Sequence, residues 1–140
     1  MPTGDSLPRI HVMAGALVDA ERRVLIAQRP AGKHMAGGWE FPGGKLTAGE
    51  TPFECLVREL REELGIEVLA AEPVIAYAHQ YADRNVFLHL WHVTRYEGTP
   101  NSAEGQAIKW VALDDLDKVG LLEADTPMIE PLKKALGSRR

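Results

Sequence analysis

The sequence predicts an α/β fold in which a mixed β-sheet lies between helices. Apolar, β-prone segments recur along the chain, an early segment carries the signals of an α-helix, and a second amphipathic segment lies near the C-terminus. A length of 140 residues suits one domain. We therefore expect a single domain over residues 1–140, with its core over about 9–136.

The expected strands are short apolar segments bounded by turn residues. They span residues 10–18, 24–28, 73–81, 86–94 and 107–113. Between the second strand and the first helix, residues 30–44 contain five glycines and two prolines, a composition that predicts a loop.

The helix that begins at Pro52 is the clearest element. Thr51 and Glu54 have the spacing of a capping box, proline suits the first helical position, and Gly65 suits the C-terminal end. Helical periodicity gathers the apolar side chains into one stripe and places three glutamates about a quarter-turn away. A second helix is expected over residues 127–136, where apolar side chains recur at helical spacing.

Composition excludes several classes of protein. Sixteen Lys and Arg against twenty Asp and Glu give a formal net charge of −4, which argues against binding a nucleic acid polymer but permits a local basic pocket. The single cysteine, Cys55, excludes an internal disulfide framework and suits a reducing compartment. No apolar segment is long enough to span a membrane, and the N-terminal segment lacks the order of a signal peptide. We therefore expect a cytoplasmic protein with no membrane partner.

Glu59, Glu62 and Glu63 form the candidate chemical centre. On a bare helix each pair would repel by about a few tenths of a kcal/mol, and a solvated acidic face is the plainer interpretation. Two features favour a site instead: no lysine interleaves the cluster, and the helix follows a glycine-rich loop whose backbone can approach a ligand. Carboxylates and a glycine carbonyl suit Mg²⁺ or Mn²⁺, and Mg²⁺ commonly shares its ligand shell with phosphates. These residues predict metal-assisted phosphate chemistry.

Gly44, Glu50 and residues 58–66 match the Nudix box, GX5EX7REUXEEXGU with U aliphatic, at every specified position. The chain therefore resembles the Nudix hydrolase family. Segments 34–36, 40–45, 49–52, 83–84 and 104–106 also resemble the MutT branch of that family. The resemblance implies a Nudix-type α/β/α sandwich that hydrolyses a nucleoside diphosphate linked to another group.

MutT-type members hydrolyse nucleoside triphosphates, 8-oxo-dGTP among them, to a nucleoside monophosphate and pyrophosphate. Water attacks the β-phosphorus, and the reaction cleans the nucleotide pool in support of DNA repair. By motif, Mg²⁺ or Mn²⁺ would bind the three glutamates of the helix and the Gly43 carbonyl, and Glu104 would add a further carboxylate. Glu59 is the preferred general base and Glu104 its competitor, while Arg58 would orient Glu59.

The resemblance also assigns residues around the metal. Arg29 and Lys45 would contact phosphates, although Arg29 can equally end a strand in solvent. Glu50 would be an outer ligand of the metal or a structural anchor for the loop. Phe41 would stack on the base or plug the loop, and Arg84 would bond base or sugar unless it is solvated.

Asp125 departs from MutT, which has an asparagine just before its last helix. An ionised aspartate only accepts hydrogen bonds, so it suits the amino group of cytosine and opposes O6 of an oxidised guanine. A desolvated, protonated Asp125 would donate to O6 instead. The alternative role is that of an N-cap for the last helix.

Other functions stay open beside this one. A diphosphatase for cytosine nucleotides, including 5-modified dCTP, follows from Asp125. A non-catalytic module that senses a nucleotide belongs to a different class, and an enzyme for ADP-ribose or a dinucleotide is a third. The expected substrate is a small nucleotide, and the protein is expected to be a monomer or a homodimer.

Overall fold

The computed structural model describes residues 9–30, 32, 35–82 and 84–137. The MutT-like positions 34 and 83 lie outside this part of the chain, as do residues 1–8 and 138–140. The elements in chain order are β1 (Arg9–Leu17), β2 (Arg23–Gln28), β3 (Trp39–Glu40), β4 (Gly43–Lys45), α1 (Pro52–Leu64), β5 (Glu67–Gln80), β6 (Asn85–Glu97), β7 (Ile108–Ala112), the 3₁₀ helices η2 (Leu113–Lys118) and η3 (Glu123–Met128), and α2 (Ile129–Leu136).

The strands form two sheets. In the larger one the order is β4-β1-β6-β5, with β1 and β6 parallel and the other pairs antiparallel. The smaller sheet has the order β3-β2-β7 and is antiparallel throughout. The prediction of an α/β fold with a mixed sheet is confirmed, although the strands divide between two sheets.

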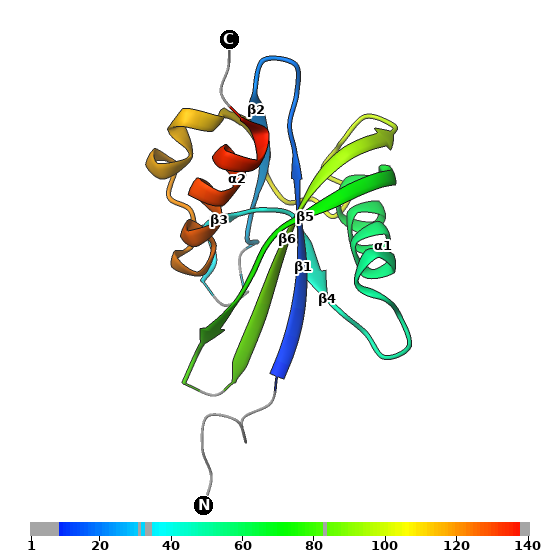
Figure 1. Ribbon diagram of the computed structural model, residues 1–140, viewed down its shortest axis with the longest axis vertical. Helices are drawn as coiled ribbons and strands as arrows, with labels where there is room; N and C mark the ends of the chain where they lie inside the picture. The colour runs from blue at the N-terminus through cyan, green and yellow to red at the C-terminus, as the bar shows by residue number, and fades with distance from the viewer. Residues whose placement is uncertain (1–8, 31, 33–34, 83, 138–140) are drawn as a thin grey trace, which may run out of the picture.

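The larger sheet lies between two helical layers, with α1 on one side and α2 with the 3₁₀ helices on the other (Figure 1). Successive side chains of β1 point to opposite faces of the sheet. Met13 and Leu17 pack with α1 on one face. Ala14 and Ala16 pack on the other face, in the cluster that includes Met128 and Leu132. The two faces of one central strand thus bury two apolar clusters.

Three differences from the sequence-based prediction have physical causes. The glycine-rich loop contains β3 and β4, because its bare backbone pairs with the edges of β2 and β1. Strand β5 begins at Glu67 rather than Pro73, since an edge strand tolerates a proline and the register shifts near it. The last α-helix begins at Ile129, because the turn around Pro127 is a 3₁₀ helix.

Helix α1 begins and ends as predicted. The Thr51 hydroxyl accepts from the Glu54 N–H at 3.1 Å, and the Glu54 carboxylate accepts from the Thr51 N–H at 2.8 Å. Gly65 ends the helix in a left-handed conformation with φ 70°. No helix in residues 9–137, as far as they are described, is long and apolar enough to cross a membrane.

Removal of the capping hydroxyl should destabilise the protein. We expect Thr51→Ala to lower the free energy of unfolding by about 1 kcal/mol, because the Glu54 N–H loses its acceptor. Urea unfolding at pH 7 measures the change. Thr51→Ser retains the hydroxyl and serves as the control, so equal stability of the Ala and Ser variants would contradict the capping role.

Candidate functional site

A cavity of about 570 Å³ opens beside the glycine pair Gly43–Gly44. Strands β1 and β6, the segment from Glu40 to Lys45, the turn after β5 and η3 all contribute to its wall. The polar and aromatic residues among its lining are Arg29, Glu40, Phe41, Lys45, Tyr81, Arg84 and Asp125. Its chemistry therefore combines cations, carboxylates and aromatic rings in one space.

The Glu59 carboxyl lies directly against Gly44. A Cβ on residue 44 would be 2.2 Å from the Glu59 Cδ and Oε1, so only glycine fits here without a shift of the carboxyl. The Glu59 side chain is 18% exposed. Burial raises its pKa, as do the charges of Glu62 and Glu104, while the hydrogen bond from Arg58 opposes the increase.

Glu63 lies against the other glycine. Its Oε2 accepts from the Gly43 N–H at 3.1 Å. Burial raises the pKa of Glu63 to about 8, and the charges of Glu40, Glu104 and Glu59 act in the same direction. Two carboxyl groups are thus held at one glycine pair, where ionisation of both is costly.

Arg58 connects the box residues to one another. Its guanidinium donates to Glu59 at 2.8 Å and to Glu62 at 3.2 Å, and it donates twice to Glu50. Glu50 also accepts from the Thr47 N–H, and these bonds lower its pKa to about 2. Arg58 thus contacts Glu59, which it was predicted to orient, and Glu50 bonds both Arg58 and the loop that precedes α1. Glu62 is 52% exposed, so it is the outermost of the three glutamates.

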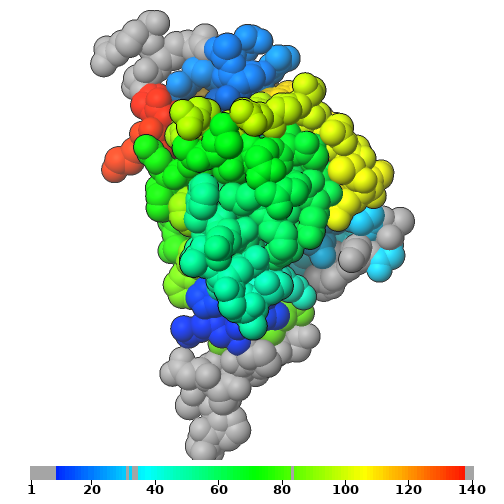
Figure 2. Space-filling model, turned by 90° about the vertical axis from the view of Figure 1, so that its right-hand side faces the viewer, coloured from blue at the N-terminus to red at the C-terminus, as the bar shows by residue number. Residues whose placement is uncertain are grey.

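The loop after β6 brings Glu104 to the end of α1. Figure 2 shows this segment in yellow alongside the green surface that α1 and β5 form. Glu104 is exposed, and its charge contributes to the raised pKa values of Glu59 and Glu63. The charges of Glu62 and Glu104 thus reach Glu59, and the charge of Glu104 reaches Glu63 as well.

The donor set fits a hard divalent cation. Its side-chain donors are carboxylates, which such ions prefer. Burial, and to a smaller extent the neighbouring negative charges, raise the pKa values of Glu59 and Glu63, and a bound positive charge would favour their ionised forms. Among the described residues, no three His, Cys, Asp or Glu side chains already converge on one cation position. A cation here would complete its shell with water and phosphate oxygens, as Mg²⁺ does.

Both residues that were predicted to contact phosphates line the cavity, but one is exposed and the other forms an ion pair. Lys45 is exposed at the end of β4. Arg29 is 30% exposed and pairs with Glu40, with its Nη1 at 3.3 and 3.4 Å from the two carboxylate oxygens. Glu40 was not selected as a site residue from the sequence, although it lies in a MutT-like segment and directly precedes Phe41.

Asp125 is buried in the cavity wall with 8% of its surface exposed. Its Oδ2 accepts from the Phe41 N–H at 3.0 Å, and burial raises its pKa to about 7. The N-cap interpretation is wrong, because Met128 precedes α2, Leu122 precedes η3, and neither helix has a side-chain cap. Phe41 itself is 3% exposed and belongs to the core cluster beneath the cavity, so its stacking on a base stays a prediction.

Tyr81 and Arg84, which lie between β5 and β6 in the chain, also line the cavity. The Arg84 guanidinium lies over the Tyr81 ring, 4.8 Å from its centroid. Tyr81 is a cavity residue that sequence reasoning missed. Its position at the end of the hairpin, next to the selected Arg84, was the available signal.

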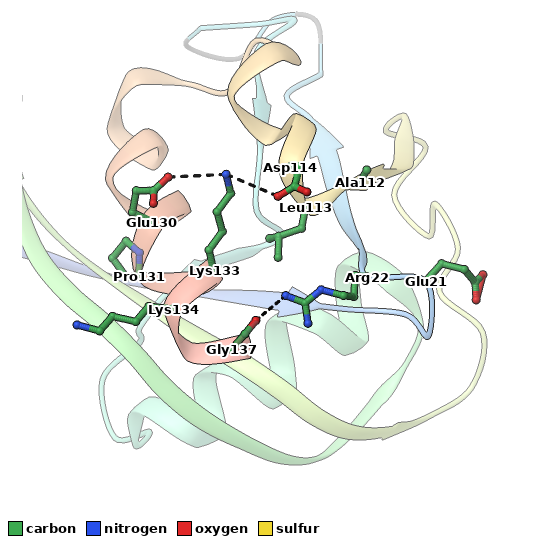
Figure 3. A pocket seen from close by; sticks show the side chains of 10 residues that line it. All are labelled: Glu21, Arg22, Ala112, Leu113, Asp114, Glu130, Pro131, Lys133, Lys134 and Gly137. Atoms are coloured by element: carbon green, nitrogen blue, oxygen red, sulfur yellow. Dashed lines mark hydrogen bonds and ion pairs between the residues drawn. The ribbon is translucent and has the colours of Figure 1, made fainter. Parts of the chain in front are cut away.

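A second cavity, of about 1020 Å³, lies among the β1–β2 turn, η2 and α2 (Figure 3). Lys133 lies between Glu130 and Asp114, at 3.7 and 4.0 Å, and Arg22 donates to the Gly137 carbonyl at 2.8 Å. Arg22 and Lys133 thus bond groups of the protein itself, and no residue of the Nudix box lines the cavity. We therefore place the chemistry at the smaller cavity.

The raised pKa of Glu63 should make stability depend on pH. Between its ordinary value of 4.5 and about 8, the folded protein keeps a proton that the unfolded chain has lost, so this residue lowers stability as the pH rises. In cation-free buffer at pH 8, we expect Glu63→Gln to stabilise the protein by at least about 1 kcal/mol, since one pKa unit is worth about 1.4 kcal/mol.

Urea unfolding in EDTA from pH 5 to pH 8 measures this difference, which should shrink at the lower pH. Glu62→Gln is the matched control on the same helix, because Glu62 is the most exposed of the three glutamates. The same pH dependence in Glu63→Gln and in the unaltered protein would contradict the assignment.

Comparisons with known proteins agree with this geometry. A family model for the NUDIX domain matches residues 13–131. The chain is 41% identical over 121 residues to a CTP pyrophosphohydrolase of Escherichia coli strain K12, covering 86% of this chain and 89% of that protein. It is 35% identical over 128 residues to the 8-oxo-dGTP diphosphatase of the same strain, covering 91% and 99%.

Solved structures show the same fold. The solution structure of the E. coli ORF135 protein has a TM-score of 0.84 and 38% identity, covering 99% of this chain and 98% of that one. A MutT structure from work on the Aliivibrio salmonicida and Vibrio cholerae proteins has a TM-score of 0.76 and 35% identity, covering 87% and 94%. The chain therefore belongs to the Nudix family, as a MutT-type Nudix hydrolase with an α/β fold.

Proposed function

We propose that the protein hydrolyses a nucleoside triphosphate to a nucleoside monophosphate and pyrophosphate, by attack of water at the β-phosphorus. One observation carries the proposal: the Glu59 and Glu63 carboxylates are held at the same glycine pair that borders a cavity of about 570 Å³. The relatives named as a CTP pyrophosphohydrolase and an 8-oxo-dGTP diphosphatase support the same reaction class.

The proposed cation is Mg²⁺, with Mn²⁺ as a substitute. When bound, it supplies positive charge for the polyphosphate and acidifies water at the site. Glu59, Glu62, Glu63, Glu104 and the Gly43 carbonyl are the proposed ligands. The free buried thiol of Cys55 is compatible with a reducing compartment, and we propose action in the cytoplasm, as a monomer or a homodimer.

The protein's own residues would position substrate and proton. Lys45 and Arg29 border the cavity and would contact the phosphates. Arg58 donates to one oxygen of Glu59 and fixes its orientation, which suits Glu59 to accept a proton from the attacking water. Glu104 is the alternative base, since it is exposed and close enough to influence both α1 carboxylates.

Pyrophosphate release tests the reaction. With Mg²⁺ and a panel of nucleoside triphosphates, we expect release by the unaltered protein and a loss of roughly 100-fold or more in Glu63→Gln and Glu62→Gln, because a group that stabilises transition-state charge is worth about 3–4 kcal/mol. Glu72→Gln, an exposed change on β5, is the matched control. No release from any triphosphate, sugar nucleotide or dinucleotide would instead favour a non-catalytic sensing module.

A second candidate function is a preference for cytosine nucleotides, and Asp125 favours it. One of its carboxylate oxygens is bonded to the Phe41 N–H, so the other oxygen is the one with capacity for a base. As a carboxylate it accepts from the amino group of cytosine, and as a carboxylic acid it donates to O6 of 8-oxoguanine. The relative named as a CTP pyrophosphohydrolase supports the cytosine preference.

Asp125→Asn should change the ranking of substrates. We expect kcat/KM for 8-oxo-dGTP relative to dCTP and 5-substituted dCTP to rise roughly 10-fold, because a mismatched buried polar group costs about 1–3 kcal/mol. An unchanged ranking would show that Asp125 does not read the base.

The unaltered protein should also change its preference with pH. Since burial raises the pKa of Asp125 to about 7, the ratio of dCTP to 8-oxo-dGTP hydrolysis should increase as the pH rises through 7. Both substrates carry the same triphosphate, so their ratio cancels the titration of metal ligands and phosphates. The Asp125→Asn variant should give a ratio that does not vary over this range.

A further inference from the structure

Gln106 is the most buried polar side chain of the described residues outside the cavity wall, with 7% of its surface exposed. Its neighbours in the loop, from Asn101 to Gly105, are exposed. A glutamine in an exposed loop is ordinarily solvated, so its burial indicates a specific use of the amide.

Both the nitrogen and the oxygen of the Gln106 side-chain amide form hydrogen bonds to the backbone of candidate site residues. Its Nε2 donates to the Glu63 carbonyl at 3.0 Å, and its Oε1 accepts from the Glu104 N–H at 3.2 Å. The Ser102 hydroxyl also contacts Oε1 and bonds the Gln106 carbonyl. One side chain therefore joins the backbone of the α1 carboxylate residue Glu63 to the backbone of Glu104.

The same loop closes the C-terminal end of α1. The Leu64 carbonyl accepts from the Asn101 N–H at 3.0 Å, and the Glu63 carbonyl accepts from the Ala103 N–H at 3.2 Å in addition to the glutamine. Carbonyls at a helix end need such donors. The loop is therefore fastened to the last turn of α1, and Gln106 is its only side chain among those described that bonds that turn.

We propose that Gln106 is a positioning residue for catalysis: it fastens the Glu104 loop to the last turn of α1 so that Glu104 faces Glu59 and Glu63. The inference rests on the proposed function and deepens it. Glu104 is exposed and has no described side-chain bond of its own, so its location depends on the loop backbone. Without the amide, its carboxylate would be spread over many positions and would bind the cation more weakly.

Gln106→Met tests the proposal, because methionine fills a similar volume and offers neither a strong donor nor a strong acceptor. In the absence of nucleotide, Mn²⁺ titrations followed by electron paramagnetic resonance should show an affinity about 10-fold lower, the size typical for residues that orient metal ligands. Pyrophosphate release at subsaturating Mg²⁺ should fall by a similar factor, while KM for the nucleotide at saturating Mg²⁺ should change little.

The double variant with Glu104→Gln separates positioning from simple structural support. If Gln106 acts through Glu104, Gln106→Met should lower Mn²⁺ affinity no further in the Glu104→Gln background. Amide hydrogen exchange without metal should accelerate at residues 102–105 and stay unchanged in the middle of α1. Asn101→Ala is the matched control on the same loop, because its side chain bonds only the Thr99 carbonyl among described groups.

Several results would overturn the proposal. The first is an unaltered Mn²⁺ affinity in Gln106→Met. The second is a double variant in which the losses of Mn²⁺ affinity from Gln106→Met and Glu104→Gln simply add. The third is unaltered Mn²⁺ affinity and turnover in Glu104→Gln. If Gln106→Met does not fold, Gln106→Glu replaces it, since it fills the same space and loses the bond donated to Glu63. Failure of the proposed function is distinct: the unaltered protein would then release no pyrophosphate, while Mn²⁺ affinity and hydrogen exchange would still report on Gln106.

Discussion

Confinement of like charges against bare backbone is the constraint on which the site depends. The Glu59 carboxyl occupies the space that a side chain at residue 44 would fill, and Glu63 bonds the N–H of Gly43. Arg58 bonds Glu59 and that single N–H bonds Glu63, but burial and the neighbouring carboxylates still raise the pKa of both glutamates. A cation bound here would therefore stabilise the folded protein, as does any ligand that binds the folded state alone.

This confinement requires that α1 be fixed both in its rotation about the helix axis and in its position against the sheet. Gly15 on β1 permits the close approach, because a Cβ there would be 2.8 Å from Cδ1 of Leu60. The capping box fixes the N-terminal end, and the loop that contains Asn101 and Gln106 fixes the C-terminal end. A helix free to rotate by a quarter-turn about its axis would direct its glutamates away from the glycine pair. The caps thus contribute to the chemistry as well as to stability.

Local signals made α1 and its carboxylates predictable from the sequence. The capping box, the terminal Gly65 and the periodic glutamates all lie within one segment. What could not be predicted depends on contacts between distant residues: the pairing of β4 with β1, the bond between Gln106 and Glu63, and the pair of Arg29 with Glu40. The alternative N-cap role for Asp125 was wrong for the same reason, because the backbone of a residue 84 positions away along the chain binds its carboxylate.

The bond between Asp125 and Phe41 joins η3 to the segment that leads into the glycine pair. Phe41 lies two residues before Gly43, so the carboxylate proposed to contact the base also holds the backbone segment whose Gly43 N–H bonds Glu63. Loss of this bond would let the glycine segment shift and alter turnover. A change in base preference would then be hard to separate from a change in turnover. An asparagine retains an oxygen that can accept from the Phe41 N–H and adds a donor for the base. Alanine retains neither the acceptor nor the donor. A defect in an alanine variant would therefore not distinguish loss of the contact with the base from displacement of the glycine segment.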